Sequence, residues 1–363
     1  MNKTTMVKVI LIGLLSFTSW SCDKSQATFS LLSASQQFTQ GAATVAVKID
    51  ILWVVDNSGS MAPLQQSLTQ NFNSFISDFI NKGYDFNMAV TTTDAYLSGP
   101  TFNNNNTYSK FKDGVGTTHT GVFVINPTTP NIVNTFVKNA TQGDQGNGDE
   151  RAFSSFQNAL TNPLNSGFPR QGSFLAVIIL SDEDDFSGAN RPAGSWAMQG
   201  GVPDHDYTYA GLSSVASYVN FLDTLTQSID PKNRHYSVSA ITVLDQACLN
   251  SHVSSSPSSI IGQRYIDIAN QTNGILSSIC SNFATSLLAI NNKILELSTQ
   301  FHLDRQPIVS SISIQINGLN IIQDSNNGWT FDATSNNIIF HGTALPQQGA
   351  TISVHFDPAS AKT

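Results

Sequence analysis

The sequence predicts an α/β fold: a doubly wound, mostly parallel sheet followed by a small all-β segment. Strand-like and helix-like stretches alternate between residues 45 and 301, which is typical of strand–helix–strand units. The stretch FLAVIIL at residues 174–180 is apolar at every position, as a strand needs when helices cover both faces of its sheet. Beyond residue 305 the apolar residues recur with a period of two, which indicates short strands.

The alternating region is read element by element from these patterns. Strands are expected at residues 45–55, 86–92, 121–125, 174–180 and 236–243. Helices are expected at residues 65–80, 129–139, 151–160 and 213–228, and within 260–301. The last helix shows a single apolar stripe that should lie on the sheet, formed by Phe283, Leu287, Ile290, Ile294, Leu297 and Phe301.

Two flanking segments complete the domain organisation. Residues 23–44 are polar and form either a tether or an added strand. Residues 305–358 read as a β-hairpin array, with Asn317-Gly318 as one of its turns. A segment this short buries little apolar surface alone, so it should pack on the domain at 45–301 or borrow a strand from residues 23–44.

The composition excludes one class of partner. Charged residues make up 12% of the chain, the net charge is -8 and the pI is near 5.2. Nothing in the sequence forms the basic stripe that binding to a phosphate backbone requires. We therefore expect no nucleic-acid partner.

The N-terminus predicts export. Lysines flank the start of a short apolar run at residues 9–17, which reads as a secretory signal peptide within residues 1–22. The stretch Ser19-Trp20-Ser21-Cys22 resembles a bacterial lipoprotein cleavage box, which would make Cys22 the lipidated first residue. Ser19 and Trp20 depart from that pattern, so simple secretion with another cleavage site stays open. The implied location is the cell envelope or outer surface, with membrane contact only through the lipid.

The cysteine count agrees with export. The chain has three cysteines, and if Cys22 carries lipid, Cys248 and Cys280 remain as one pair. In an oxidising compartment these two should form a disulfide. The alternative is two buried, reduced thiols.

Oxygen-bearing side chains follow the first predicted strand. Asp56, Ser58 and Ser60 lie two residues apart at its end, where open α/β sheets bind their ligands. Two hydroxyls and one carboxylate suit a hard cation such as Mg²⁺, with Mn²⁺ or Ca²⁺ as alternatives. An Asx-turn or a helix N-cap would explain the same residues without a metal.

A second acidic cluster points to a family. Residues 181–185 (SDEDD) follow the apolar strand at 174–180 and should reach the same edge. With DILWVVDNSGSM, LAVIILSDEDD and YIDIANQTNGILSSIC, the chain resembles a von Willebrand factor type A (VWA) domain, a Rossmann-like fold, over residues 45–301. The resemblance implies a metal-ion-dependent adhesion site in which Ser58 and Ser60 bind Mg²⁺ directly. Asp56 and Asp182 would hold the ion directly or through water.

The family's middle motif is altered in this sequence. The family supplies a threonine from the loop before its third helix, and the matching loop, residues 143–150 (GDQGNGDE), has none. Asn147, Asp149 or Glu150 could replace it, or the two acids could face the dipole of the following helix. An added carboxylate at the metal would weaken its attraction for an acidic ligand. Asp94 could support the site from outside or act as a turn residue.

Three functions are compatible with these features. The first is a binding module whose Mg²⁺ accepts a protein ligand, through an acidic side chain of that ligand. In such a module, by analogy with integrin-like members, the last helix would couple the sheet edge that binds the metal to the chain at 305–308. The second is an envelope scaffold whose metal site is stabilising or vestigial. A metal-dependent hydrolase is disfavoured because no general-base motif accompanies Ser58, and we expect no enzyme activity.

Overall fold

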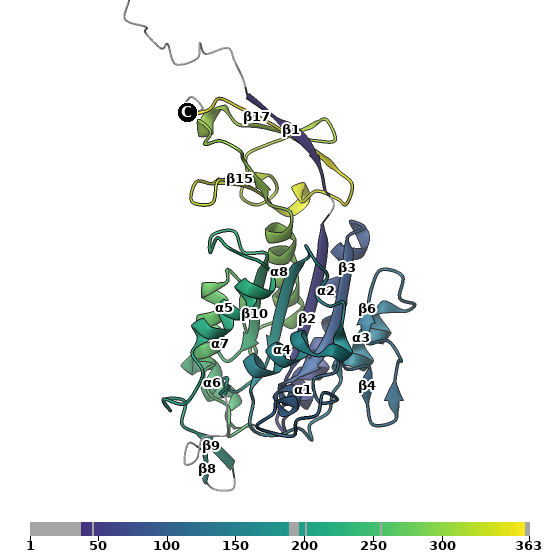
Figure 1. Cartoon of the computed structure of the whole chain (residues 1–363), viewed down its shortest axis with the longest axis vertical. Helices are drawn as coiled ribbons and strands as arrows, with labels where there is room; N and C mark the ends of the chain where they lie inside the picture. Colours follow the sequence, from purple (N-terminus) through teal and green to yellow (C-terminus); the bar gives the residue numbers. More distant parts are fainter. Residues whose placement is uncertain (1–37, 46, 189–195, 200–201, 255, 360–363) are drawn as a thin grey trace, which may run out of the picture.

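The computed structural model describes residues 38–45, 47–188, 196–199, 202–254 and 256–359. Within them it shows an α/β body and a smaller β part (Figure 1), as the sequence predicts at this level. The expected signal peptide and Cys22 lie outside the described residues, as do residues 23–37. No helix among the described residues is long and apolar enough to cross a membrane.

A six-stranded sheet forms the centre of the body. Its strands follow the order β11-β10-β7-β2-β3-β6, and all neighbours are parallel except the edge strand β6, which is antiparallel to β3. In the central pair, Val55 of β2 lies opposite Leu180 of β7. The residues that follow these two strands therefore leave the sheet side by side. The strands are β2 (Lys48–Val55), β3 (Asp85–Thr92), β6 (Val124–Ile125), β7 (Phe174–Leu180), β10 (Tyr236–Thr242) and β11 (Leu276–Ser278).

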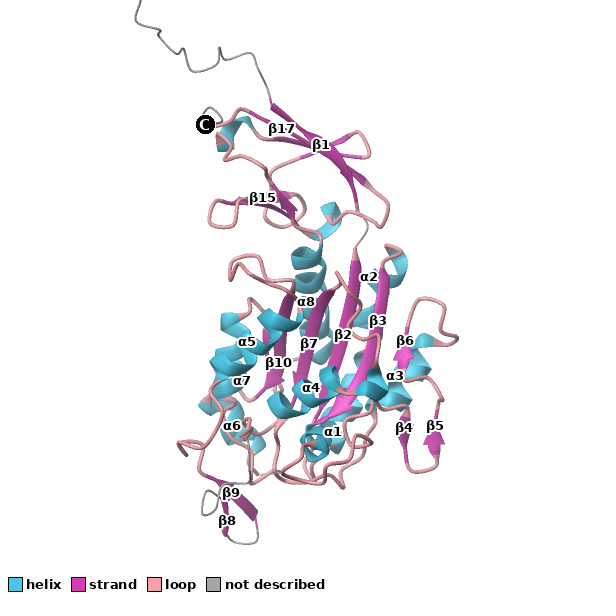
Figure 2. Ribbon diagram, in the orientation of Figure 1, coloured by secondary structure: helices cyan, strands magenta, loops and turns pink. Residues whose placement is uncertain are grey.

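Helices cover both faces of this sheet (Figure 2). Along β2, Ile51, Trp53 and Val55 point into one core, whereas Leu52 and Val54 point into the other. The first core is shared with α1 (Ala62–Asn71), α2 (Asn73–Asn81), α3 (Ile132–Ala140) and α8 (Phe283–Ser298). The second is shared with α4 (Ala152–Thr161), α5 (Val215–Leu225) and α7 (Gln263–Gln271). A further helix, α6 (Gln246–His252), follows β10.

Several boundaries differ from the prediction. The helix expected at 65–80 is two helices that meet at Phe72, a buried residue whose ring stacks on Phe136. The strand expected at 121–125 is shortened to β6. Phe301, expected in the last helix, begins a strand because α8 ends at Ser298. Short elements without a strong apolar period were not expected: β4 (Gly114–Val115), β5 (Thr118–His119), β8 (Trp196–Gln199), β9 (Val202–His205), η1 (Thr93–Ser98), η2 (Pro163–Asn165), η3 (Val309–Ser311) and η4 (Gly342–Ala344).

The C-terminal part consists of two small sheets. One has the order β1-β17-β13-β14 and the other β12-β16-β15. Asn317 and Gly318 form the turn between β13 and β14, with φ angles of 51° and 78°. β1 pairs antiparallel with β17, so residues 38–44 form an added strand. The strands are β1 (Phe38–Thr44), β12 (Phe301–His302), β13 (Ser313–Ile316), β14 (Leu319–Ile321), β15 (Trp329–Asp332), β16 (Asn337–Phe340) and β17 (Thr351–Phe356).

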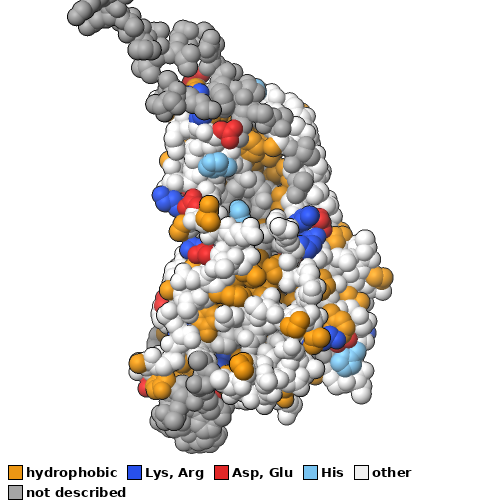
Figure 3. Space-filling model, in the orientation of Figure 1, with side chains coloured by type: hydrophobic (Ala, Val, Ile, Leu, Met, Phe, Trp, Pro, Cys, Tyr) orange, Lys and Arg blue, Asp and Glu red, His pale blue; other side chains and the backbone are white. Residues whose placement is uncertain are grey.

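The β part packs on the body through a shared core. Buried residues of β16 and β17 belong to the same apolar cluster as those of α2 and α8. Polar contacts reinforce this packing: Lys82 Nζ donates to Leu345 O at 3.2 Å, and Glu296 of α8 pairs with His341 at 2.8 Å. Figure 3 shows that charged side chains are few and scattered on the face in view.

Candidate metal centre

The four residues expected to bind a cation meet at the carboxyl edge of the central sheet. Asp56 follows β2, and its backbone N–H donates to Leu180 O at 2.9 Å. Ser60 Oγ donates to Asp182 Oδ1 at 3.0 Å, although the two residues are 122 positions apart. Ser58 Oγ lies 3.5 Å from Ser60 Oγ. The parallel register of β2 and β7 thus brings these four side chains together.

Asp56 is the most enclosed member of the set. It is fully buried, and its Oδ1 accepts a hydrogen bond from the Ser58 N–H at 2.8 Å, which is an Asx-turn. Its Oδ2 accepts from Ser181 Oγ at 2.7 Å. The N-cap alternative is wrong, because α1 begins after Met61 and has no side-chain cap. Asp56 therefore orders the loop that presents Ser58 and Ser60.

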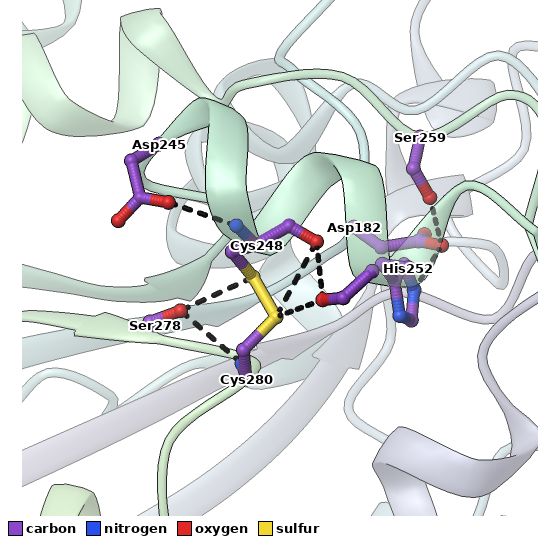
Figure 4. Close-up of a disulfide and its surroundings, with 8 residues drawn as sticks. Asp182, Asp245, Cys248, His252, Ser259, Ser278 and Cys280 are labelled. Atoms are coloured by element: carbon purple, nitrogen blue, oxygen red, sulfur yellow. Dashed lines mark hydrogen bonds and ion pairs between the residues drawn. A yellow bond between two sulfur atoms is a disulfide. The ribbon is translucent and has the colours of Figure 1, made fainter.

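Asp182 is held by residues that the sequence did not suggest. Its Oδ2 accepts from Ser256 Oγ at 2.6 Å and Ser259 Oγ at 2.8 Å, and it lies 3.2 Å from His252 Nε2 (Figure 4). The clustering of serines at 256–259 is the feature of the sequence that could have suggested hydroxyl donors near the site. These contacts leave Oδ1 for Ser60.

A disulfide fixes the element that carries His252. Cys248 of α6 is bonded to Cys280, which follows β11, with a Cα–Cα distance of 5.8 Å (Figure 4). This is the pair that the cysteine count predicts. Asp245 Oδ1 also caps α6 by accepting from the Cys248 N–H at 2.8 Å. The covalent bond therefore ties the wall of the site next to Asp182 to the edge of the sheet.

The middle loop, residues 142–150, is clamped against the Asp56 loop. Gln65 Nε2 donates to both Asp56 O and Gly143 O at 2.8 Å, and the Gly146 N–H donates to Asn57 O at 2.7 Å. A Cβ at Gly146 would lie 2.4 Å from Asn57 Nδ2, so this close approach requires glycine. The predicted alternatives for the missing threonine all lie on this loop.

Three of the other predicted residues have structural partners. Asp94 accepts from Asn57 Nδ2 at 3.0 Å and from the Asn147 N–H at 3.2 Å, so it joins the first and middle loops. Asp149 forms an ion pair with Arg151 at 3.1 Å, and both side chains are fully buried. Asp94 therefore supports the two loops, and the carboxylate of Asp149 is bound by the Arg151 guanidinium.

The helix-start explanation for Asp149 and Glu150 is wrong. The first turn of α4 contains no acidic residue. Its free N–H groups are met instead by Asp185, whose Oδ1 accepts from the Phe153 N–H at 2.9 Å. Asp185 also pairs with Arg264 at 3.0 Å, so it is an element of the framework.

Glu150 instead helps to line a cavity of about 280 Å³ beside Ser58 and Ser60. Its side chain is fully buried, neither carboxyl oxygen accepts a hydrogen bond from an N–H or hydroxyl group, and its polar neighbour is the carboxyl group of Glu183. Such a group is costly to bury unless something else binds it. The cavity is lined by Ser58, Gly59, Ser60, Gly148, Glu150, Glu183, Ser256, Pro257 and Ser258.

Burial and mutual repulsion raise the pKa values of three carboxyl groups at this site. Burial, together with the charge of Asp182, raises the pKa of Asp56 to about 7. Burial raises the pKa of Glu183 to about 8, and burial and the charge of Glu183 raise the pKa of Glu150 well above its ordinary value. Burial also disfavours charge on Asp182, but hydrogen bonds from His252, Ser256, Ser259 and Ser60 outweigh it and lower its pKa.

The donor set fits a hard divalent cation. Among the described residues, no Lys or Arg pairs with Asp56, Asp182, Glu150 or Glu183, and of these four only Asp182 has a basic partner, His252, at 3.2 Å. All candidate donors are oxygens, which Mg²⁺ and Ca²⁺ prefer. Acids, histidines and cysteines alone do not form a metal-binding group of three or more in the part of the chain described. Any site therefore depends on the serine hydroxyls.

Comparisons with known proteins give remote matches only. No family model and no curated protein matches the sequence. The similar solved structures include the pilus adhesin SpaC from Lactobacillus rhamnosus GG, at 12% identity and a TM-score of 0.41, over 85% of this chain and 38% of that one. They also include the pilus adhesin RrgA from Streptococcus pneumoniae, at 10% identity and a TM-score of 0.33, over 88% of this chain and 58% of that one. A third is the type V pili tip protein Mfa5 from Porphyromonas gingivalis, at 11% identity and a TM-score of 0.34, over 88% of this chain and 62% of that one. The chain thus spans less than two thirds of each, and similarity at this level carries no functional argument.

Proposed function

We propose that the chain is an exported VWA-type protein that binds a protein ligand at a divalent-cation site. The observation that carries this proposal is the meeting of Asp56, Ser58, Ser60 and Asp182 at one sheet edge, where no Lys or Arg balances the acids. Together they offer two carboxyl groups and two hydroxyls as oxygen donors. A divalent cation would bind these oxygens and neutralise the carboxylates.

Each residue has a distinct role in this proposal. Ser58 and Ser60 would hold the cation through their hydroxyls, with Asp182 beside Ser60 and Asp56 ordering the loop. When bound, Mg²⁺ would supply a positive centre that attracts an oxygen of the ligand. We propose binding and not catalysis, since the nearby His252 ring contacts Asp182 and is not poised as a base for Ser58.

The position of the site suits display on a cell envelope. The carboxyl ends of β2 and β7 lie at the opposite end of the molecule from β1, which is the described segment nearest the N-terminus (Figure 1). If Cys22 carries the proposed lipid, the cation site would face away from the membrane. A ligand could then reach it without contacting the anchor.

The scaffold alternative is supported by one observation. Glu150 and Glu183 add two carboxyl groups to the cavity beside the serines. A cation held among that many acids would attract an acidic ligand less strongly and would mainly join the surrounding loops. In this case Ser58→Ala and Asp182→Ala would alter ligand binding no more than they alter stability.

The test is calorimetric titration of Mg²⁺, Mn²⁺ and Ca²⁺ into the mature protein after treatment with EDTA. Saturable binding near one equivalent that is lost in Asp56→Ala would support the proposal. A matched variant, Asp144→Asn, removes an acid from the same loop cluster but outside the cavity lining and should bind normally. If the folded wild type binds none of the three cations, the proposal is wrong.

A further inference from the structure

We infer that Glu150 binds the cation directly and fills the coordination position that an acidic ligand would otherwise take. This inference rests on the proposed cation site and defines how that site is completed. The chain would then hold the cation with its own carboxylate. A bound partner would need no Asp or Glu at the metal.

The first support is the state of the Glu150 side chain. It is fully buried, belongs to the cavity lining with Ser58 and Ser60, and its oxygens meet no N–H or hydroxyl donor but only the carboxyl group of Glu183. Asp56 and Asp182, in contrast, each accept at least two hydrogen bonds. Two buried carboxyl groups in contact, with no basic group or other donor on Glu150, are the arrangement that a bound cation would stabilise.

The second support is that the backbone on both sides of Glu150 is fixed. The Glu150 carbonyl accepts from the Phe186 N–H at 2.8 Å. On one side the Asn147 N–H is bound by Asp94, and on the other Arg151 is bound to Asp149 and lies 5.0 Å from the Tyr96 ring. The position of Glu150 in the cavity lining is therefore fixed by the loop around it.

The third support is that Glu150 lies on the middle loop, which packs against the loop of Asp56. The middle loop lies against the Asp56 loop, where the Gly146 N–H bonds to Asn57 O. The resemblance described above expects a threonine from this loop, and the residue that the loop turns into the cavity is Glu150. A carboxylate in that position adds a full negative charge to that of Asp182. Two acids already balance the charge of a divalent cation, so the completed site would attract another acid only weakly.

The experiment uses the mature protein and two variants of Glu150. Glu150→Gln keeps the size of the side chain but removes its charge, and Glu150→Thr supplies the hydroxyl that the family pattern expects. Mg²⁺ affinity is measured by calorimetry, and the number of waters on bound Tb³⁺ is measured from luminescence lifetimes in H₂O and D₂O. Asp144→Asn is the control, and thermal unfolding in EDTA checks that each variant folds.

If the inference is right, Glu150→Gln weakens Mg²⁺ binding by at least about 10-fold and adds at least one water to bound Tb³⁺. Glu150→Thr also gains water, and its cation takes up acetate, which the wild type does not. Unchanged affinity and water number in both folded variants would overturn the inference but leave the proposed function standing. Failure of the wild type to bind any cation would overturn both.

Discussion

Glu183→Gln should stabilise the cation-free protein, and the gain should grow as pH rises above about 4.5. Burial raises the pKa of Glu183 from 4.5 to about 8 in the folded protein. Between these values the folded state keeps a proton that the unfolded state releases, so the free energy of unfolding falls as pH rises. The loss amounts to about 4 kcal/mol at pH 8 as an upper limit, because each pKa unit corresponds to roughly 1.4 kcal/mol. Glutamine carries no such penalty.

The assay is thermal unfolding in EDTA at pH 5 and pH 8. The variant should nearly match the wild type at pH 5 and unfold a few degrees higher at pH 8, since each kcal/mol is worth roughly 2–4 °C for 150–250 residues and less in this longer chain. Saturating Mg²⁺ should reduce the difference, because the cation neutralises the same charge. Asp144→Asn serves as the control on a neighbouring loop. Equal dependence on pH in Glu183→Gln and the wild type would refute the electrostatic reasoning.

Other predictions concern the framework around the site. Replacing Cys248 and Cys280 by serine should lower the free energy of unfolding by about 3.5–4 kcal/mol, since their disulfide closes a loop with a sequence separation of 32; a loss below 1 kcal/mol in urea unfolding would contradict this. Arg170→Met leaves the buried Asp50 carboxylate without its charged partner at 2.8 Å, although the Ser173 hydroxyl and the backbone N–H of residue 170 still bind it, and should cost about 3 kcal/mol by the same assay, with Asp85→Asn as a milder control. Ser259→Ala removes a hydrogen bond from Asp182 and should weaken Mg²⁺ binding about 10-fold at pH 6, measured by calorimetry; unchanged affinity would show that Asp182 needs no such support. Mg²⁺ together with a ligand should alter protease cleavage at 300–310, where α8 passes into β12, and identical cleavage patterns would exclude coupling through this helix.

The central strands were predictable because their burial is complete on both faces. The strand predicted at 174–180 is β7 with the same boundaries. A strand that is apolar at every position is expected in the centre of a sheet covered by helices on both faces. The same reasoning located Asp56 and Asp182 at strand ends, because parallel neighbours finish at one edge. The body therefore followed from periodicity.

The surroundings of the site were less predictable because they depend on single polar contacts. Nothing in the order of residues showed that Ser256 and Ser259 would reach Asp182, 74 and 77 positions away. Asp149 and Glu150 are adjacent acids with the same local pattern. Only the buried position of Arg151 separates them, since it pairs with Asp149 and leaves Glu150 facing the cavity.

The continuity of β1 and β2 has a mechanical consequence. β1 runs almost directly into β2, and the metal edge lies at the far end of β2 (Figure 1). A pull between the chain before Phe38 and a ligand at that edge would act along β1 and β2, whose backbones are already extended, so these strands could gain little length under load. β2 would share the force with β3 and β7 through shear of their parallel ladders. β1 would in turn share the force with β17 through their antiparallel ladder, and the molecule would behave as a short, stiff rod.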